Sequence, residues 1–272
     1  MAPERRILII GGGAMGGALL RGVLQKGLYQ PDEIEVAEPV PALQAALASE
    51  FGVAVNALER TDAWSHELAL VCLKPQVFGS AMQRFREDRS LDIGLYVSIM
   101  AGVSLHSLQL AAGTGSVIRA MPNTPAQVLT GMTMWTATSG VSQAQRESAR
   151  AIFAAVGEEL YTDHEADLDR ATAINGSGPG YLFLVLEAMI DAGVHIGLSR
   201  DAATKLATQT FLGSGELAKQ MVDIHPAELR NRVTSPGGTT AAGVQELELA
   251  GLRGVFTSAI ESAWKRSREL GG

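Results

Sequence analysis

Residues 7–16 read Ile-Leu-Ile-Ile-Gly-Gly-Gly-Ala-Met-Gly, and an amphipathic stretch continues from them to Lys26. This order places Gly-x-Gly-x-x-Gly between a short apolar strand and a helix, which is the context in which the motif binds a dinucleotide. The first glycine allows a tight turn, the second lets the backbone approach a pyrophosphate, and the third allows the strand and the helix to pack closely. The helix start then faces the phosphates with free N–H groups. The stretch predicts a Rossmann-type domain whose cofactor site includes Gly11, Gly12, Gly13, Ala14, Met15 and Gly16.

The composition narrows the class of protein. A chain of 272 residues can form one large domain or two smaller ones around a packed core. The formal net charge is −7 with both signs mixed along the chain, which predicts no nucleic acid and no anionic membrane as a partner. The apolar run before the glycines is too short for a signal peptide, and Glu187 and Asp191 interrupt the one long apolar stretch. We therefore expect a cytoplasmic protein with a small ligand.

Up to about residue 160, short β-type runs alternate with amphipathic helical stretches, a pattern typical of a doubly wound parallel sheet. Two later runs, 132–137 and 159–161, flank a helical pattern over Gln143–Val156 and can extend the same sheet. The candidate strands are Ile7–Ile10, Ile34–Ala37, Val53–Val55, Leu68–Leu73, Tyr96–Met100, Val117–Ala120, Met132–Ala137 and Glu159–Tyr161. We predict an α/β dinucleotide-binding domain over residues 1–163.

Beyond that point the periodicity is helical, which predicts a second, all-helical domain over residues 164–272. The expected helices are Asp167–Ile174, Tyr181–Ile196, Arg200–Met221, Pro226–Arg232 and Thr240–Glu269. The second and third carry apolar residues on more than one face, and a domain of this size offers little core to bury them. We expect a homodimer whose C-terminal helices interlock.

Glu38 follows the second expected strand, about twenty residues after the glycines, where a carboxylate can accept the ribose hydroxyls of an adenosine. A 2′-phosphate would lie against this charge, and residues 39–47 contain no Lys or Arg to neutralise it. Glu38 thus favours NADH as the coenzyme. The alternative is that its side chain faces solvent.

Two further loops follow expected strands, at the edge of the sheet where ligands bind in open α/β folds. Lys74-Pro75 follows one strand, and Met121-Pro122-Asn123-Thr124-Pro125 follows another. The prolines would stiffen these loops beside the nicotinamide half of the coenzyme, while Asn123 and Thr124 offer hydrogen bonds. The alternative is that both are ordinary turns.

The expected helical domain contains two glycine-rich segments, Asn175–Tyr181 and Thr234–Thr240. Each precedes a helical pattern, so each would present backbone N–H groups and hydroxyls at a helix start, where a carboxylate can bind. The alternative is helix capping by Ser and Thr.

The sequence offers no obvious metal site, nucleophile or strong base. The five histidines are isolated from one another, and the lone cysteine, Cys72, lies in an apolar strand pattern. This inventory suits hydride delivery with weak acid assistance from a hydroxyl or water.

At these residues the chain resembles the pyrroline-5-carboxylate reductase family along essentially its whole length. The most specific match is the last of the segments that carry the resemblance. They are Ile10–Gly16, Leu73–Pro75, Arg119–Pro125, Gly176–Tyr181 and Val233–Thr240. The chain departs from the family's usual residues at Asn175, where Ser is common, at Gly180, where Ala is common, and at Glu38.

The resemblance implies reduction of Δ1-pyrroline-5-carboxylate to L-proline by hydride transfer from NADPH or NADH. It implies that amides of the loop formed by Ser235, Gly237, Gly238 and Thr239 hold the substrate carboxylate. It also implies that the hydroxyl of Thr240, the expected catalytic residue, hydrogen-bonds the ring nitrogen. We place Ser177 in the substrate site as well. Members form interlocked C-terminal dimers, which often assemble into larger rings.

Two other readings remain open at this point. The chain could reduce another small cyclic imine or a β-hydroxy acid, although the segment Ser177–Ala188 lacks the lysine that hydroxy-acid chemistry would need. It could also be a non-catalytic nucleotide-binding dimer, although such a scaffold would not need the loop at Ser235–Thr240.

Overall fold

The computed structural model of the chain describes residues 6–57, 64–79 and 91–270. The chain folds into two compact units. The first unit is Met1–Ser177 together with Ala263–Gly272, and the second unit is Gly178–Ser262. This division of the packing falls after Ser177, while the domain boundary expected after residue 163 stays a prediction.

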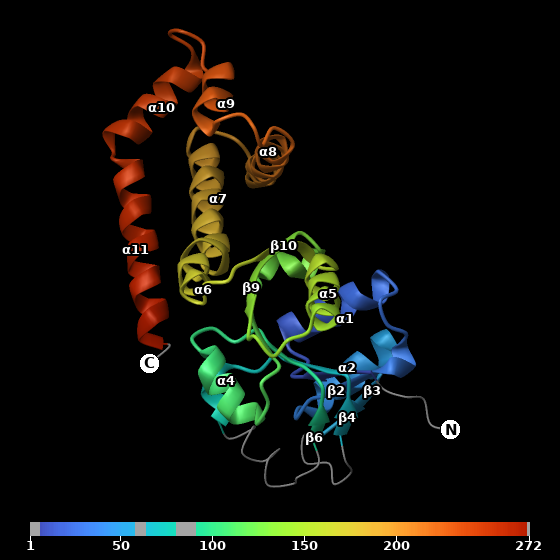
Figure 1. The fold of residues 1–272 in the computed structure, drawn as a ribbon. Helices are drawn as coiled ribbons and strands as arrows, with labels where there is room; N and C mark the ends of the chain where they lie inside the picture. The colour runs from blue at the N-terminus through green and yellow to red at the C-terminus, as the bar shows by residue number, and fades with distance from the viewer. Residues whose placement is uncertain (1–5, 58–63, 80–90, 271–272) are drawn as a thin grey trace. The chain divides into compact units, whose positions relative to one another are not determined.

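The first unit is built on an eight-stranded sheet in the order β10-β9-β8-β7-β5-β1-β2-β3 (Figure 1). Its strands are β1 (Ile7–Ile10), β2 (Ile34–Ala37), β3 (Ala54–Asn56), β5 (Leu68–Val71), β7 (Tyr96–Ser98), β8 (Val117–Met121), β9 (Gly131–Ala137) and β10 (Gly157–Tyr161). A small second sheet pairs β4 (Trp64–His66) with β6 (Leu91–Ile93) in parallel. This second sheet was not predicted from the sequence, because strands of three residues carry too little periodicity to be recognised.

One pair of strands departs from the expected parallel sheet, since β8 and β9 run antiparallel. Only the segment around the 3-10 helix η2 (Thr124–Val128) joins them, and such a connection is too short for the crossover that a parallel pair needs. The other strand pairs of the large sheet are parallel. The expected Rossmann-type α/β fold is confirmed, with this one reversal.

Helices cover both faces of the large sheet, so that the alternate residues of β1 enter two different cores. Ile7 and Ile9 pack with α1 (Ala14–Gln25), α2 (Pro41–Phe51) and α5 (Gln143–Ala154), whereas Leu8 and Ile10 pack with α4 (Leu105–Ala112). All four residues are fully buried. A strand buried on both faces reads as an unbroken apolar run, which is why residues 7–10 mark the centre of the sheet.

The rest of the chain is helical, as expected from its periodicity. The helices are α6 (Ala166–Ala171), the π-helix η3 (Thr172–Gly176), α7 (Gly178–His195), α8 (Arg200–Gln220), α9 (Pro226–Arg232), α10 (Thr239–Leu249) and α11 (Leu252–Leu270). The single helix expected over Thr240–Glu269 is wrong, because the chain breaks at Gly251, whose φ of +75° is a left-handed conformation that ends α10. Within the second unit, α7 packs along α8.

Candidate active site

The glycine turn after β1 has the tight geometry that its sequence predicts. Gly11 has a φ of +98°, and its amide donates a hydrogen bond to Ala37 O at 2.8 Å. A Cβ at this position would stand 2.8 Å from Cys72 O, and one at Gly16 would stand 2.0 Å from Gly11 O. Neither space admits a side chain, so Gly11 is required by its positive φ and by the approach of Cys72 after β5, and Gly16 by the packing of α1 against the turn.

Gly13 is glycine for a different reason. It caps the N-terminus of α1 at an ordinary φ of −63°, and because glycine has no side chain, the first turn receives no side-chain cap. A Cβ built on Gly13 would meet no atom of the protein within 4 Å. The helix start that carries Ala14 and Met15 therefore faces open space with its N–H groups, which suits an anion.

Glu38 is drawn into this turn rather than pointing to solvent. It is 5% exposed, and its Oε2 accepts a hydrogen bond from the Gly12 amide at 2.8 Å, while its Oε1 accepts one from the Val40 amide at 3.0 Å. The two N–H donors fix the carboxylate at the end of β2, beside the start of α1. The reading in which Glu38 faces solvent is wrong.

The loops after β5 and β8 lie at the same edge of the sheet as the glycine turn, because β1, β5, β7 and β8 are mutually parallel and their carboxyl ends coincide. Lys74 and Pro75, which follow β5, are exposed, as is Thr124. Asn123 accepts a hydrogen bond from the Met132 amide through Oδ1 at 2.8 Å, so that oxygen already has a partner. The Nδ2 of Asn123 is the atom it can offer to a ligand.

One segment of this edge, residues 100–104, was not predicted from the sequence. It follows β7 between the loops of β5 and β8. Gly102 there has a φ of +74°, and a Cβ on it would stand 2.8 Å from Leu270 O. The position of this segment after a parallel strand was the signal that could have found it.

The first glycine-rich segment of the helical region is helical itself, so the expectation of free amides there is wrong for Ser177. Its amide donates to Thr172 O at 2.8 Å and closes the π-helix. Pro179 then falls in the first turn of α7, where its missing N–H costs nothing. Asn175 Nδ2 donates to Met121 O at 2.8 Å, and a Cβ on Gly176 would stand 2.8 Å from Met121 Cε. The segment is thus packed against the loop after β8.

The second glycine-rich segment is an open turn that leads into α10. The Gly238 amide donates to Ser235 O at 3.0 Å, and Gly237 has a φ of +69°, as a type II turn with proline in its second position requires. Gly238 caps α10 without a side-chain hydrogen bond, so the first amides of the helix, from Thr239 and Thr240, have no capping side chain. The turn presents them as donors for an anion.

Within the described ranges, the structure gives little support to a metal site, a membrane-spanning helix or a reactive thiol. No cluster of His, Cys, Asp or Glu there could hold a metal ion, and no helix there is long and apolar enough to cross a membrane. Burial raises the pKa of the Cys72 thiol to about 12, so it is not a nucleophile at neutral pH. The expected cytoplasmic location stays a prediction.

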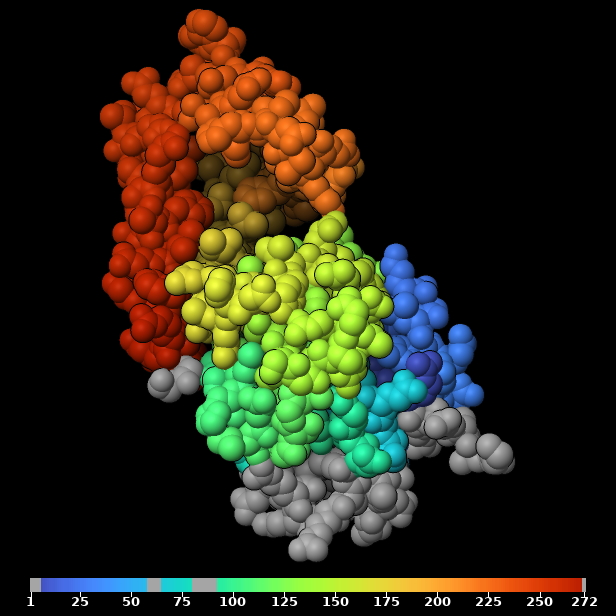
Figure 2. All heavy atoms as spheres, viewed as in Figure 1, coloured from blue at the N-terminus to red at the C-terminus, as the bar shows by residue number. Residues whose placement is uncertain are grey.

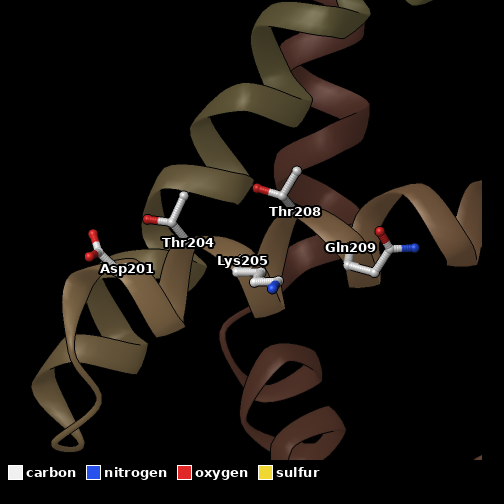
Figure 3. A pocket seen from close by; sticks show the side chains of 5 residues that line it. All are labelled: Asp201, Thr204, Lys205, Thr208 and Gln209. Atoms are coloured by element: carbon white, nitrogen blue, oxygen red, sulfur yellow. The ribbon is translucent and has the colours of Figure 1, made fainter.

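A hollow of about 490 Å³ on the second unit collects none of the expected site residues. It runs along one face of α8, with five polar side chains around it (Figure 3). They are Asp201, Thr204, Lys205, Thr208 and Gln209. Because all five come from a single helix, we assign the hollow no part in the reaction.

Comparison with known proteins gives consistent results over both parts of the chain. Residues 165–270 match the family model described as pyrroline-5-carboxylate reductase dimerisation, and residues 6–102 match the model described as NADP oxidoreductase, coenzyme F420-dependent. The chain is 42% identical over 263 residues to the pyrroline-5-carboxylate reductase of Synechocystis, covering 97% of each chain. It is 40% identical over 288 residues to that of Mycobacterium leprae, covering 97% of this chain and 96% of the other.

Solved structures give the same result. The pyrroline-5-carboxylate reductase of Coxiella burnetii superposes with a TM-score of 0.89 at 30% identity and 99% coverage of each chain. The Plasmodium falciparum pyrroline carboxylate reductase, solved with NADP bound, superposes with a TM-score of 0.85 at 28% identity and full coverage of both chains.

Proposed function

The chain belongs to the pyrroline-5-carboxylate reductase family, and on that premise we propose which of its residues carry out the reduction of Δ1-pyrroline-5-carboxylate to L-proline. It is an oxidoreductase of proline biosynthesis that uses a nicotinamide coenzyme. The observation that carries the assignment of roles is the pair of uncapped helix starts, at Gly13 and at Gly238. Each offers backbone donors to an anion, and the reaction has two anionic participants, the coenzyme pyrophosphate and the substrate carboxylate.

The residues of the first unit fit a dinucleotide. The open space around Gly13, which a Cβ would enter, suits the pyrophosphate against the first amides of α1. Lys74, Pro75, Met121, Asn123 and Thr124 line the edge at which the nicotinamide would lie. When bound, the reduced nicotinamide supplies the hydride.

We assign NADH as the preferred coenzyme because of Glu38. Both of its oxygens are fixed by backbone N–H groups, so the carboxylate cannot swing away without leaving those donors unpaired. A 2′-phosphate at about 4 Å from this charge would be repelled by about 1 kcal/mol with the screening of bulk water, and by more where water is excluded. Arg21, the cation on the adjoining helix, already pairs with Glu50 at 2.7 Å.

We place the substrate carboxylate on the turn Ser235–Gly238 and the first amides of α10. Gly237 and Gly238 keep this turn narrow, and Thr239 and Thr240 supply the helix-start donors. The hydroxyl of Thr240 then hydrogen-bonds the ring nitrogen. We propose the hydroxyl of Ser177 as a further substrate contact, since its amide is already bonded within the π-helix.

The chemistry asked of these residues is modest. A hydride adds to the imine carbon, the C=N electron pair moves to nitrogen, and one proton is needed there. Solvent water supplies that proton through the hydroxyl of Thr240, and the helix-start amides hold the ring by its carboxylate. The absence of a strong base from the sequence pattern agrees with a reaction that only takes up a proton.

The protein forms homo-oligomers through the helical region that matches the dimerisation model. The long helices α7 and α8 of the second unit expose large apolar side chains in the single chain. Examples are Leu182, Phe183, Leu184, Leu206 and Leu212, each more than half exposed. In Figure 2, the orange atoms of α8 and α9 lie on the surface of this unit. We propose a homodimer that buries these residues, with assembly into a ring of dimers as a further step.

The test is to supply Δ1-pyrroline-5-carboxylate to the purified protein and to follow NADH and NADPH oxidation in parallel, with proline measured as the product. We expect one proline formed for each coenzyme oxidised, and a higher kcat/KM with NADH. Oxidation of neither coenzyme, with coenzyme binding intact, would instead point to another cyclic imine or to a non-catalytic dimer. Sedimentation at micromolar concentration tests the oligomer, and a monomer there would contradict the proposed interface.

A further inference from the structure

A buried arginine stands two residues before Met121 on β8. Arg119 is 5% exposed, and its guanidinium donates hydrogen bonds to two carboxylates of one helical segment. Nη1 donates to Glu165 Oε1 at 3.0 Å, and Nη2 donates to Asp169 Oδ1 at 2.8 Å. Since the planar guanidinium offers donors in fixed directions, two such bonds set the position of α6 against the strand.

The carboxylate of Glu165 also holds the loop that follows β7. Glu165 Oε1 accepts a second hydrogen bond, from the Leu105 amide, at 2.7 Å. Residues 100–104 lie directly before that amide, at the edge of the sheet between the loops of Lys74 and Met121. Arg119 therefore fixes this edge loop through Glu165.

The C-terminal turn of α11 joins the same network. Ser267 is 4% exposed, and its hydroxyl stands 3.5 Å from Asp169 Oδ1. Leu270 O packs against Gly102 so closely that a Cβ on that glycine would stand 2.8 Å from it. All of these residues belong to the first unit.

A second link ties the same helical segment to the same strand. Beyond α6 the chain enters the π-helix, where Asn175 bonds Met121 O at 2.8 Å. The segment from Glu165 to Gly176 is thus fixed to β8 at Arg119 and again at Met121. Two attachment points fix both the position and the direction of the segment.

We propose that Arg119 is a positioning residue for the reduction, which holds the edge loop 100–104 and the Met121 region in the places where they meet the nicotinamide. This inference rests on the proposed function. The glycine turn and Glu38 follow β1 and β2, and among the described residues no hydrogen bond joins them to the network, so Arg119 acts on the nicotinamide end alone. Displacements of about 1 Å at such a site reduce turnover by roughly 100-fold.

The test uses three variants of the full chain. Arg119→Met removes the guanidinium. Arg119→Lys retains the charge but replaces the planar guanidinium with a single ammonium nitrogen. The triple variant Arg119→Met/Glu165→Gln/Asp169→Asn removes all three charges, so it leaves no buried carboxylate without a counter-charge and serves if the single variant fails to fold. Arg146→Met is the matched control, because Arg146 bonds Tyr161 Oη at 2.7 Å and Thr138 O at 3.2 Å, within α5 and the strand ends around it.

We expect kcat to fall by roughly 30-fold in Arg119→Met and in the triple variant, with the coenzyme KM changed by less than about threefold. Arg119→Lys should recover part of the lost kcat. Amide hydrogen exchange over residues 100–105 should accelerate in the Met and triple variants and stay unchanged in Arg146→Met.

A triple variant that turns over within about twofold of the parent would overturn the proposal, as would a coenzyme KM that rises as much as kcat falls. Failure of the proposed function is recognised separately, because the parent chain itself would then fail to form proline. The exchange of residues 100–105 would still report on the network in that case.

Discussion

The chain contains two glycine-rich turns that each lead into a helix without a side-chain cap, and they differ in how closely the protein surrounds them. In the turn before α1, the positions of Gly11 and Gly16 are crowded by backbone atoms, and only Gly13 faces open space. In the turn before α10, a Cβ on Gly237 would meet nothing within 4 Å. The first turn is therefore shaped by the packing of β1 and α1, and the second by its own local hydrogen bond. A glycine required by packing, such as Gly16, can thus be told apart from one required by its backbone conformation, such as Gly237. Gly238 is required by its own turn, because a Cβ there would stand 2.3 Å from Ser235 Oγ.

The largest effect expected from this comparison is at Gly16. In Gly16→Ala the new Cβ would stand 2.0 Å from Gly11 O, so the turn must open, at a cost of about 3 kcal/mol. Thermal unfolding should show Tm lowered by roughly 6–12 °C. Gly17→Ala is the matched control, since its Cβ would make an ordinary contact of 3.7 Å with Gly12 O, and it should be neutral or slightly stabilising. Equal Tm values for the two variants would show that the turn is not shaped by packing.

Next in size is the loss of the Thr240 hydroxyl in the open turn. Thr240→Ala keeps the backbone amide and should lower kcat by roughly 100-fold, because the ring nitrogen loses its hydrogen-bond partner. The unfolding temperature should stay unchanged. Thr257→Ala, which makes the same truncation at a hydroxyl bonded to Arg253 O on α11, provides the comparison. Full turnover in Thr240→Ala would mean that water or another group serves the nitrogen.

A smaller effect is expected at Glu38, which gives the first turn its charge. Glu38→Gln keeps the shape of the side chain and removes the charge, so the ratio of kcat/KM for NADPH to that for NADH should rise about tenfold, or by about 1.4 kcal/mol. Steady-state kinetics with both coenzymes measure it. A parent enzyme that already prefers NADPH strongly would contradict the role given to this carboxylate.

The smallest effect on the comparison of the two turns is expected from labelling Cys72. This residue reports on the first turn because its backbone packs against Gly11. Because burial raises the pKa of this thiol to about 12, the thiolate fraction is negligible at pH 8, and labelling by iodoacetamide should be far slower than that of a free thiol. The same reagent applied to the unfolded chain in denaturant is the control. Rapid labelling of the folded protein would mean that the turn opens readily.

The sequence determined much of the first turn because its constraints are local. The apolar run, the three glycines of the motif and the start of the amphipathic helix all lie within residues 7–16, so their geometry follows from their order. Glu38 could be placed at the end of β2, but its hydrogen bond from the Gly12 amide could not be foreseen, because it depends on the pairing of β2 beside β1.

Elsewhere the sequence was less informative, because the deciding contacts lie far apart in the chain. Asn175 and Met121 are 54 residues apart, so their hydrogen bond left no periodic trace, and the segment around Ser177 was taken for a loop. The β-type pattern of β9 does not show the direction of the strand. That direction follows from the connection after β8, which is too short for a parallel crossover. The buried pair of His66 and Glu35, at 3.2 Å, joins β4 to β2 in a way that no local motif indicates.

The proposal that the first turn binds the coenzyme and the second binds the imine is tested most directly by Gly13→Ala. The KM values for coenzyme and imine are measured beside those of Thr240→Ala. The φ of −63° at Gly13 suits alanine, and its Cβ would meet no protein atom within 4 Å, so the fold and Tm should be unchanged. We predict a coenzyme KM raised at least about tenfold in Gly13→Ala with the imine KM unaffected, and no change of coenzyme KM in Thr240→Ala. An unchanged coenzyme KM in a folded Gly13→Ala would contradict the account, because the space around Gly13 would then not be where the pyrophosphate binds.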